Sequence, residues 1–191
     1  MAALHSGIGP LWHVPVERYH TLIDRGILGP GDRVELLEGI IVQKVSKNPP
    51  HRIATRLSRL ALERVIPPNW YVDAQEPITL QASEPEPDIA VIRGDTRMYA
   101  RRHPGLGDIG LVVEVADTTM DRDRIVKKRI YAAAGIPFYW LLDLNSRKLE
   151  TYSEPKGSEY ASATEHAAHE SVTVILDGVT VGSVAVSDLL P

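Results

Sequence analysis

The sequence predicts an α/β (α+β) fold, in which a β-sheet is flanked by helices and supplemented by β-hairpins. Two observations carry this prediction. The stretch Leu111–Leu144 has the pattern of a strand, a helix and a second strand. Elsewhere, short apolar runs are separated by tight-turn residues, which is typical of hairpins. A chain of 191 residues suits a single domain, residues 1–191, with a sizeable core.

The stretch Leu111–Val115 is an almost continuous apolar run, as expected for a strand buried on both faces beneath helices. Glu114 alone breaks the run. A carboxylate costs roughly several kcal/mol to bury unpaired, so Glu114 needs a cation or a full set of donors. A buried glutamate on a central strand is therefore a candidate functional residue.

A helix is predicted from about Asp121 to Ala134, followed by an apolar strand at Phe138–Leu142. Thr118, Thr119 and Asp121 offer N-cap chemistry, and Gly135 and Pro137 end the helix. At about 100° per residue, one side of the helix carries Asp123, Val126, Lys127, Ile130 and Ala134. Lys127 is thus expected at the flank of the face that packs on the sheet.

The N-terminal part of the sequence is predicted to form a short amphipathic helix and a hairpin. The helix spans Pro15–Gly26, with Tyr19, Leu22 and Ile23 available to pack. The hairpin joins Val34–Leu37 to Ile40–Val42 through a tight turn at Glu38 and Gly39. Spacing alone makes Glu38 a solvent-exposed turn residue.

Another helix is predicted from about His51 to Val65, with a buried stripe formed by Ile53, Leu57 and Leu60. Three arginines, Arg52, Arg56 and Arg59, lie together on another side. They form either a phosphate-contacting stripe or a solvated face on which Arg59 pairs with Glu63. Spacing leaves both alternatives open.

Further strands are predicted at Trp70–Ala74, Pro77–Leu80 and Ile89–Ile92, and Asp88 stands at the entrance of the last of these. A strand at Lys148–Tyr152 and a final hairpin that turns at Asp177 and Gly178 follow. Residues 155–170 are rich in Ser, Ala, Glu and His, and we expect them to form a mobile loop.

Composition narrows the class of protein. The chain has no cysteine, which excludes disulfides, thiolate zinc sites and cysteine nucleophiles. No window approaches the roughly 18 apolar residues of a membrane span, and the first residues lack a basic, apolar leader. We therefore expect a cytoplasmic protein with no membrane partner. The net charge of −4 means that nucleic-acid binding would need a local basic patch.

Asp88, Glu114 and Lys127 indicate a function only when they are considered together. If their two strands pair, the carboxylates converge at one end of the sheet. Two carboxylates with a backbone carbonyl suit a hard cation such as Mg²⁺, which prefers oxygen ligands and keeps several waters. Such a metal lowers the pKa of bound water and holds a phosphoryl oxygen, and a nearby lysine orients the water. The set suits a metal-dependent phosphodiesterase.

The segments PEPDIAVI, LVVEVAD and DRIVKKRIYAAAGIPFYWLLDL, preceded by VELLEGIIV, resemble the Uma-type family of proposed restriction endonucleases, within the PD-(D/E)XK nuclease superfamily. The similarity runs from about Pro15 to the last hairpin. It implies a restriction-endonuclease-like mixed β-sheet flanked by helices. It also implies that Asp88 is the metal-binding aspartate of the PD motif and that Glu114 is the acidic residue of the second motif.

The chain departs from the superfamily pattern at Ala116, where a lysine is expected. The resemblance implies that the lysine is displaced to a D-R-x-x-K segment, which Asp123, Arg124 and Lys127 match. Lys128 is expected to point elsewhere on the helix. Glu38 matches an acidic position in the family's first hairpin and could reach the metal directly or through water.

The implied activity is metal-dependent hydrolysis of DNA phosphodiester bonds. Asp88, Glu114 and the Val115 carbonyl would hold Mg²⁺ or Mn²⁺, and Lys127 would position the attacking water. Arginines such as Arg52, Arg56 and Arg124 would contact phosphates, and a homodimer would serve double-strand cutting. Two alternatives remain: a catalytically inactive nuclease fold that binds DNA or protein, and a purely structural role for these residues.

Overall fold

The computed structural model describes residues 10–117 and 120–191, so the predicted N-cap residues Thr118 and Thr119 lie outside the described part. The helices are α1 (Val16–Asp24), α2 (Pro49–Glu63) and α3 (Lys128–Ala133), and a π-helical segment, Arg122–Lys127, leads directly into α3. The strands are β1 (Val34–Leu37), β2 (Ile40–Gln43), β3 (Trp70–Asp73), β4 (Ile89–Arg93), β5 (Ile109–Ala116), β6 (Phe138–Asp143), β7 (Lys148–Lys156), β8 (Glu159–Ala167), β9 (Ser171–Leu176) and β10 (Val179–Ala185).

A six-stranded mixed sheet forms the centre of the molecule, with strand order β3-β4-β5-β6-β7-β8. Only β5 and β6 run parallel, because the π-helical segment and α3 connect them as a crossover. The other neighbours in this sheet are antiparallel. The predicted strand-helix-strand unit is therefore confirmed as the centre of the fold, and the fold class is confirmed with it.

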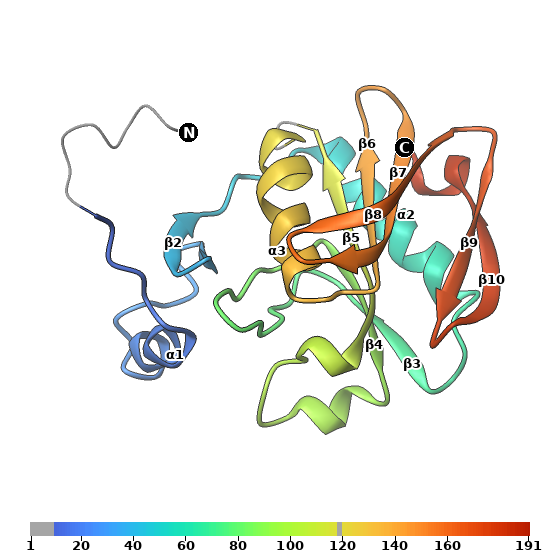
Figure 1. The fold of residues 1–191 in the computed structure, drawn as a ribbon. Helices are drawn as coiled ribbons and strands as arrows, with labels where there is room; N and C mark the ends of the chain where they lie inside the picture. The colour runs from blue at the N-terminus through green and yellow to red at the C-terminus, as the bar shows by residue number, and fades with distance from the viewer. Residues whose placement is uncertain (1–9, 118–119) are drawn as a thin grey trace.

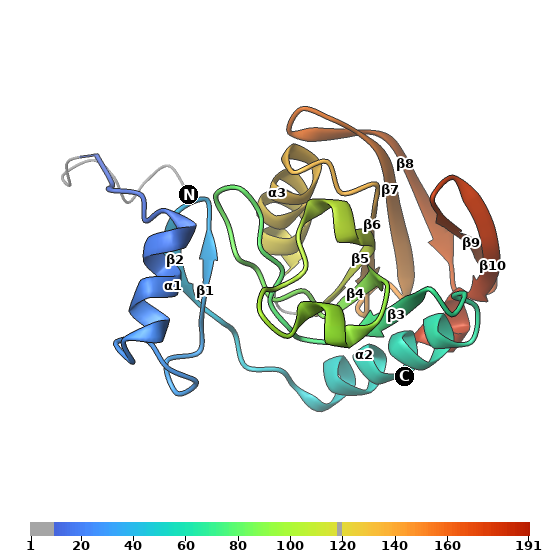
Figure 2. The same cartoon turned by 90° about the horizontal axis from the view of Figure 1, so that it is seen from below.

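Helices cover both faces of this sheet, as Figures 1 and 2 show for α2 and α3. Successive residues of β5 point to opposite faces, so Val113 and Val115 pack with α2 and the β9–β10 hairpin. Val112 and Ala116 pack with α3 on the other face. All of β5 is buried, as the apolar run predicted.

The N-terminal helix α1 and the β1–β2 hairpin stand to one side of the main sheet in both views (Figures 1 and 2). The hairpin is fixed to the body by backbone hydrogen bonds between Leu36 and Glu84, with N···O distances of 2.7 and 3.3 Å. Leu36 is fully buried with Val16 and Tyr19 of α1. Glu35, next to Leu36, consequently faces the main body.

Three sequence predictions are wrong. Residues 155–170 contain the whole of β8 in place of a loop, because an edge strand exposed on one face needs few apolar residues. Pro77–Leu80 forms no strand and makes only an isolated bridge from Thr79 to Gly105. In α2, Ile53 and Leu60 are 45% and 39% exposed, whereas the small residues Ala54 and Ala61 face the sheet and allow close packing.

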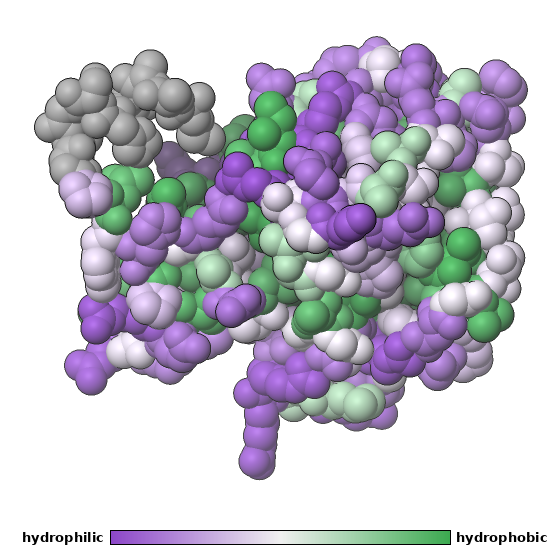
Figure 3. Space-filling view, viewed as in Figure 1, coloured by the Kyte–Doolittle hydropathy of each residue, from purple (hydrophilic) through white to green (hydrophobic). Residues whose placement is uncertain are grey.

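The face shown in Figure 3 carries hydrophobic residues scattered among hydrophilic ones. Exposed apolar side chains occur on the N-terminal part, at Trp12 and Ile27, and on the body, at Met98 and Ile125. Within the described residues, no helix is long and apolar enough to span a bilayer.

Candidate active site

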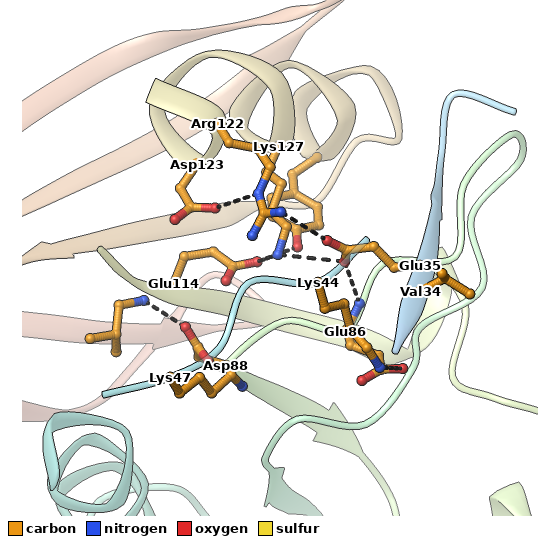
Figure 4. Close-up of polar contacts among 12 residues, drawn as sticks. Val34, Glu35, Lys44, Lys47, Glu86, Asp88, Glu114, Arg122, Asp123 and Lys127 are labelled. Atoms are coloured by element: carbon orange, nitrogen blue, oxygen red, sulfur yellow. Dashed lines mark hydrogen bonds and ion pairs between the residues drawn. The ribbon is translucent and has the colours of Figure 1, made fainter. Parts of the chain in front are cut away.

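Strand pairing brings the two predicted carboxylates to one end of the sheet. The register sets Ile89 of β4 opposite Val113 of β5, so Asp88 and Glu114 lie side by side just beyond the last pair. Asp88 Oδ2 accepts a hydrogen bond from the Val115 N–H at 3.0 Å. The N–H and C=O of one strand residue point to the same side, so the Val115 carbonyl also lies toward Asp88. Figure 4 shows Asp88 and Glu114 in the same part of the site.

Asp88 is buried and in contact with two basic side chains. Lys47 Nζ lies 3.0 Å from Oδ1, and His51 Nε2 lies 3.0 Å from Oδ2. Burial alone would raise the pKa of Asp88, but the His51 hydrogen bond and the charges of Lys47 and Lys127 outweigh it and hold this pKa well below its usual range. Asp88 is therefore a carboxylate that can serve as a cation ligand.

Glu114 lies on the face of β5 that packs against α3. Its Oε1 accepts hydrogen bonds from Lys127 Nζ at 2.8 Å and from the Tyr131 hydroxyl at 2.7 Å. Burial raises the pKa of Glu114 to about 8, and the neighbouring Asp123 and Asp88 charges add to this, although Lys127 opposes the shift. These donors satisfy the buried glutamate, as the sequence argument required.

Lys127 reaches the carboxylates from the last residue of the π-helical segment. Its Nζ contacts Glu114 and lies 3.7 Å from Glu35 Oε2. Burial would lower the pKa of Lys127, but the charges of Glu114, Glu35 and Asp123 dominate and raise it above the ordinary value. The side chain therefore acts as a charged donor, not as a base. Lys128 instead approaches Glu159 and Tyr152, away from the pocket, as predicted.

Glu35 of β1 is an acidic residue that sequence reasoning missed. It is buried, its Oε2 accepts a hydrogen bond from the Glu86 N–H at 3.2 Å, and it lines the pocket with Asp88, Glu114 and Lys127. The signal was present in the sequence, because Glu35 interrupts an apolar strand in the same way as Glu114 does.

The structure does not bring Glu38 to this pocket. Glu38 and Gly39 have φ angles of 49° and 77° and form the tight turn predicted from spacing. The Glu38 side chain is 43% exposed and is held by Arg129, whose Nε lies 3.1 Å from Oε1. A direct role at the site therefore fits Glu35 rather than Glu38.

The predicted phosphate-contacting arginines lie outside the pocket. Arg52, Arg56 and Arg59 share the exposed side of α2 and line a separate shallow depression. Arg59 donates to Glu63 at 2.8 Å, which matches the solvated-face alternative for that residue. Arg124 is bound by Glu150 of β7, with an Nε–Oε2 distance of 3.2 Å. Arg122 lines the pocket instead, and it was not among the predicted site residues.

The chemistry of the pocket fits a hard cation. Within residues 10–117 and 120–191, no three His, Cys, Asp or Glu side chains are arranged as a complete metal site. Asp88 and Glu114 nevertheless supply two neighbouring carboxylates, and the Val115 backbone supplies a carbonyl on the same side. This donor set leaves positions for water, as Mg²⁺ requires.

A mixed sheet flanked by helices, with an acidic pocket and a buried lysine at the end of its central strands, defines a restriction-endonuclease-like fold. The Uma2 family model, described as "Putative restriction endonuclease", matches residues 16–185, and the chain belongs to this family. This confirms the resemblance seen in the sequence motifs.

One similar solved structure is described as "a putative nuclease belonging to DUF820" from Anabaena variabilis ATCC 29413. It is 16% identical to this chain, with a TM-score of 0.67, and the match covers 92% of this chain and 97% of the other. At this identity, the likeness supports the fold alone. A search among curated proteins found no match.

Proposed function

We propose that the protein is a metal-dependent endonuclease that hydrolyses phosphodiester bonds of DNA. The observation that carries the proposal is the convergence of Asp88, Glu114 and Lys127 in one buried pocket, as Figure 4 shows. Membership of a family described as restriction endonucleases supports the same chemistry. The fold alone would not support this function, because nuclease-like folds can carry other functions.

Asp88, Glu114 and the Val115 carbonyl are the groups that would hold Mg²⁺ or Mn²⁺. When bound, such a cation supplies positive charge to a phosphoryl oxygen and makes water more acidic. The protein prepares this site by keeping the Asp88 carboxylate ionised, because the hydrogen bond from His51 and the charges of Lys47 and Lys127 lower its pKa against the effect of burial.

We propose that Lys127 and Glu35 position the attacking water. Lys127 keeps its proton, donates to Glu114, and has further N–H groups for a water oxygen or a phosphate oxygen. Glu35 lies on the other side of Lys127 and offers an oxygen that can accept a hydrogen bond from that water. We propose that Glu35 takes the role predicted for Glu38.

The proposed reaction is a hydrolysis in which all bonds and protons are accounted for. The water oxygen forms a bond to phosphorus, and the bond between phosphorus and the 3′ oxygen breaks. The proton lost by the water is balanced by the proton gained by the 3′ oxygen. The products are a 5′-phosphate and a 3′-hydroxyl. We further propose that a homodimer places one such pocket on each strand of duplex DNA.

Cleavage of supercoiled plasmid and of single-stranded DNA tests the proposal. Wild type, Asp88→Asn and Lys127→Ala are compared with Mg²⁺, with Mn²⁺ and with EDTA. We expect nicking or cutting by wild type with metal, and its loss in both variants and in EDTA. No cleavage by folded wild type, together with DNA binding that needs no metal, would instead favour an inactive binding module.

A further inference from the structure

Arg122 lies in the wall of the active-site pocket and has carboxylate neighbours only at long range. It is the first residue of the π-helical segment, and its side chain is 24% exposed. Figure 4 shows the guanidinium between Asp123 and Glu35, above Glu114. The pocket lining includes Arg122 together with Asp88, which places it beside the groups proposed to act on the phosphodiester.

The guanidinium of Arg122 makes no hydrogen bond to any residue in the described ranges. Its nearest carboxylate oxygens are Glu35 Oε1 and Asp123 Oδ1, each at 3.9 Å, which is beyond hydrogen-bonding distance. Its Nε is buried and unsatisfied within the same ranges. Burying a charged donor without an acceptor is unfavourable, so this arrangement suits a residue whose acceptor arrives with a ligand.

Two arginines near Arg122 in the chain have close carboxylate partners. Arg124, two residues further on, is bound by Glu150, and Arg129 is bound by Glu38. The contrast between Arg122 and Arg124 is informative, because both belong to the same segment but only Arg122 faces the pocket. Of these three arginines, only Arg122 lines the pocket and has a buried donor without a hydrogen-bond partner in the described ranges.

The chemistry of the expected ligand follows from the geometry of a guanidinium. Its planar fork of N–H groups matches two oxygens of a phosphate better than it matches a single neutral acceptor. The carboxylates of Glu35 and Asp123 lie nearest to Arg122, so its positive charge favours the approach of an anion to this part of the pocket.

We propose that Arg122 binds the non-bridging oxygens of the phosphodiester that is cleaved, and is thus a catalytic residue. This inference rests on the proposed function. Arg122 orients the phosphate against Lys127 and offsets the charge that develops on its oxygens. The arginine predicted from the D-R-x-x-K pattern, Arg124, has no such position.

The test compares Arg122→Gln and Arg122→Lys with the matched control Arg124→Gln. Plasmid cleavage gives kcat and KM, and fluorescence anisotropy gives the affinity for labelled duplex DNA in an Asp88→Asn background, where no cleavage interferes. Hydrogen bonds to charged groups predict a loss of about 10- to 100-fold in kcat/KM and weaker DNA binding for Arg122→Gln. Arg122→Lys keeps the charge and recovers part of the loss.

We expect Arg124→Gln to cleave and bind within about twofold of its parent, because Arg124 is bound by Glu150 and lies outside the pocket. Equal effects of Arg122→Gln and Arg124→Gln, with active wild type, would overturn the role of Arg122 while leaving the nuclease proposal intact. If wild type cleaves nothing, the nuclease proposal fails. The anisotropy series then still decides whether Arg122 binds DNA phosphate, and equal affinities would reject it. Arg122→Lys serves if Arg122→Gln does not fold.

Discussion

The buried pair of Glu114 and Lys127 gives a quantitative prediction about stability. The two side chains are 3% and 4% exposed, and their Oε1 and Nζ atoms lie 2.8 Å apart. Removing one partner of such a pair leaves an uncompensated buried charge, which typically costs about 3–5 kcal/mol. We therefore expect Lys127→Met to lower the free energy of unfolding by about 3 kcal/mol.

A double-mutant cycle separates the pair from its surroundings. Glu114→Gln keeps an acceptor for the Tyr131 hydroxyl, so it removes the charge and little else. The double variant leaves neither charge unpaired, and it should be more stable than additivity predicts by about 2 kcal/mol. Urea unfolding at pH 9 is the suitable assay, because Glu114 is ionised above its pKa of about 8 while Lys127 keeps its proton.

Arg59 and Glu63 provide the control. Their Nε and Oε1 atoms also lie 2.8 Å apart, but both side chains are largely accessible to solvent. Pairs of this kind on helices contribute at most about 0.5 kcal/mol. If the cycle for Glu114 and Lys127 gives no more coupling than the cycle for Arg59 and Glu63, the reasoning about the buried pair is refuted.

Three further predictions concern the same pocket. Because burial raises the pKa of Glu114, its contribution to stability is favourable below about pH 4.5 and is lost as the pH rises through about 8. Urea unfolding should show wild type losing stability relative to Glu114→Gln over this range, and a constant difference would contradict the assignment. Lys47→Gln should lower the Mn²⁺ concentration needed to raise the melting temperature, whereas Lys44→Gln, whose parent lysine contacts Glu86, should leave it unchanged. Glu35→Gln should reduce plasmid cleavage at least tenfold and Glu38→Gln should not; the reverse result would restore the original prediction for Glu38.

Sequence patterns identified the core of the fold because β5 and β6 are buried on both faces and carry continuous apolar runs. The same patterns failed for α2. There the buried side includes His51, Thr55 and Ser58, because the beginning of the helix faces Asp88 and small side chains allow close contact with the sheet. A prediction from hydrophobicity alone therefore assigns the wrong side of such a helix to the core.

The choice between Glu35 and Glu38 in the β1–β2 hairpin illustrates a second limit of sequence reasoning. Motif matching selected Glu38, which lies in the turn, whereas Glu35 lies on the strand that is bonded to Glu84 through Leu36. Which side of a hairpin faces the body depends on this long-range pairing, and local spacing does not encode it. The apolar neighbours of Glu35 were the only local indication that it is buried.

The π-helical segment explains why Lys127 was predicted and Arg122 was not. A periodicity of about 100° per residue places Asp123 and Lys127 on one side of a regular helix, and the structure buries both. A π-helix widens the turn to hydrogen bonds between residues five apart, so Arg122 also joins the side that carries Lys127. Such single wide turns occur frequently at functional sites. The wide turn therefore adds a second cation to the pocket, which a regular α-helix would have directed elsewhere.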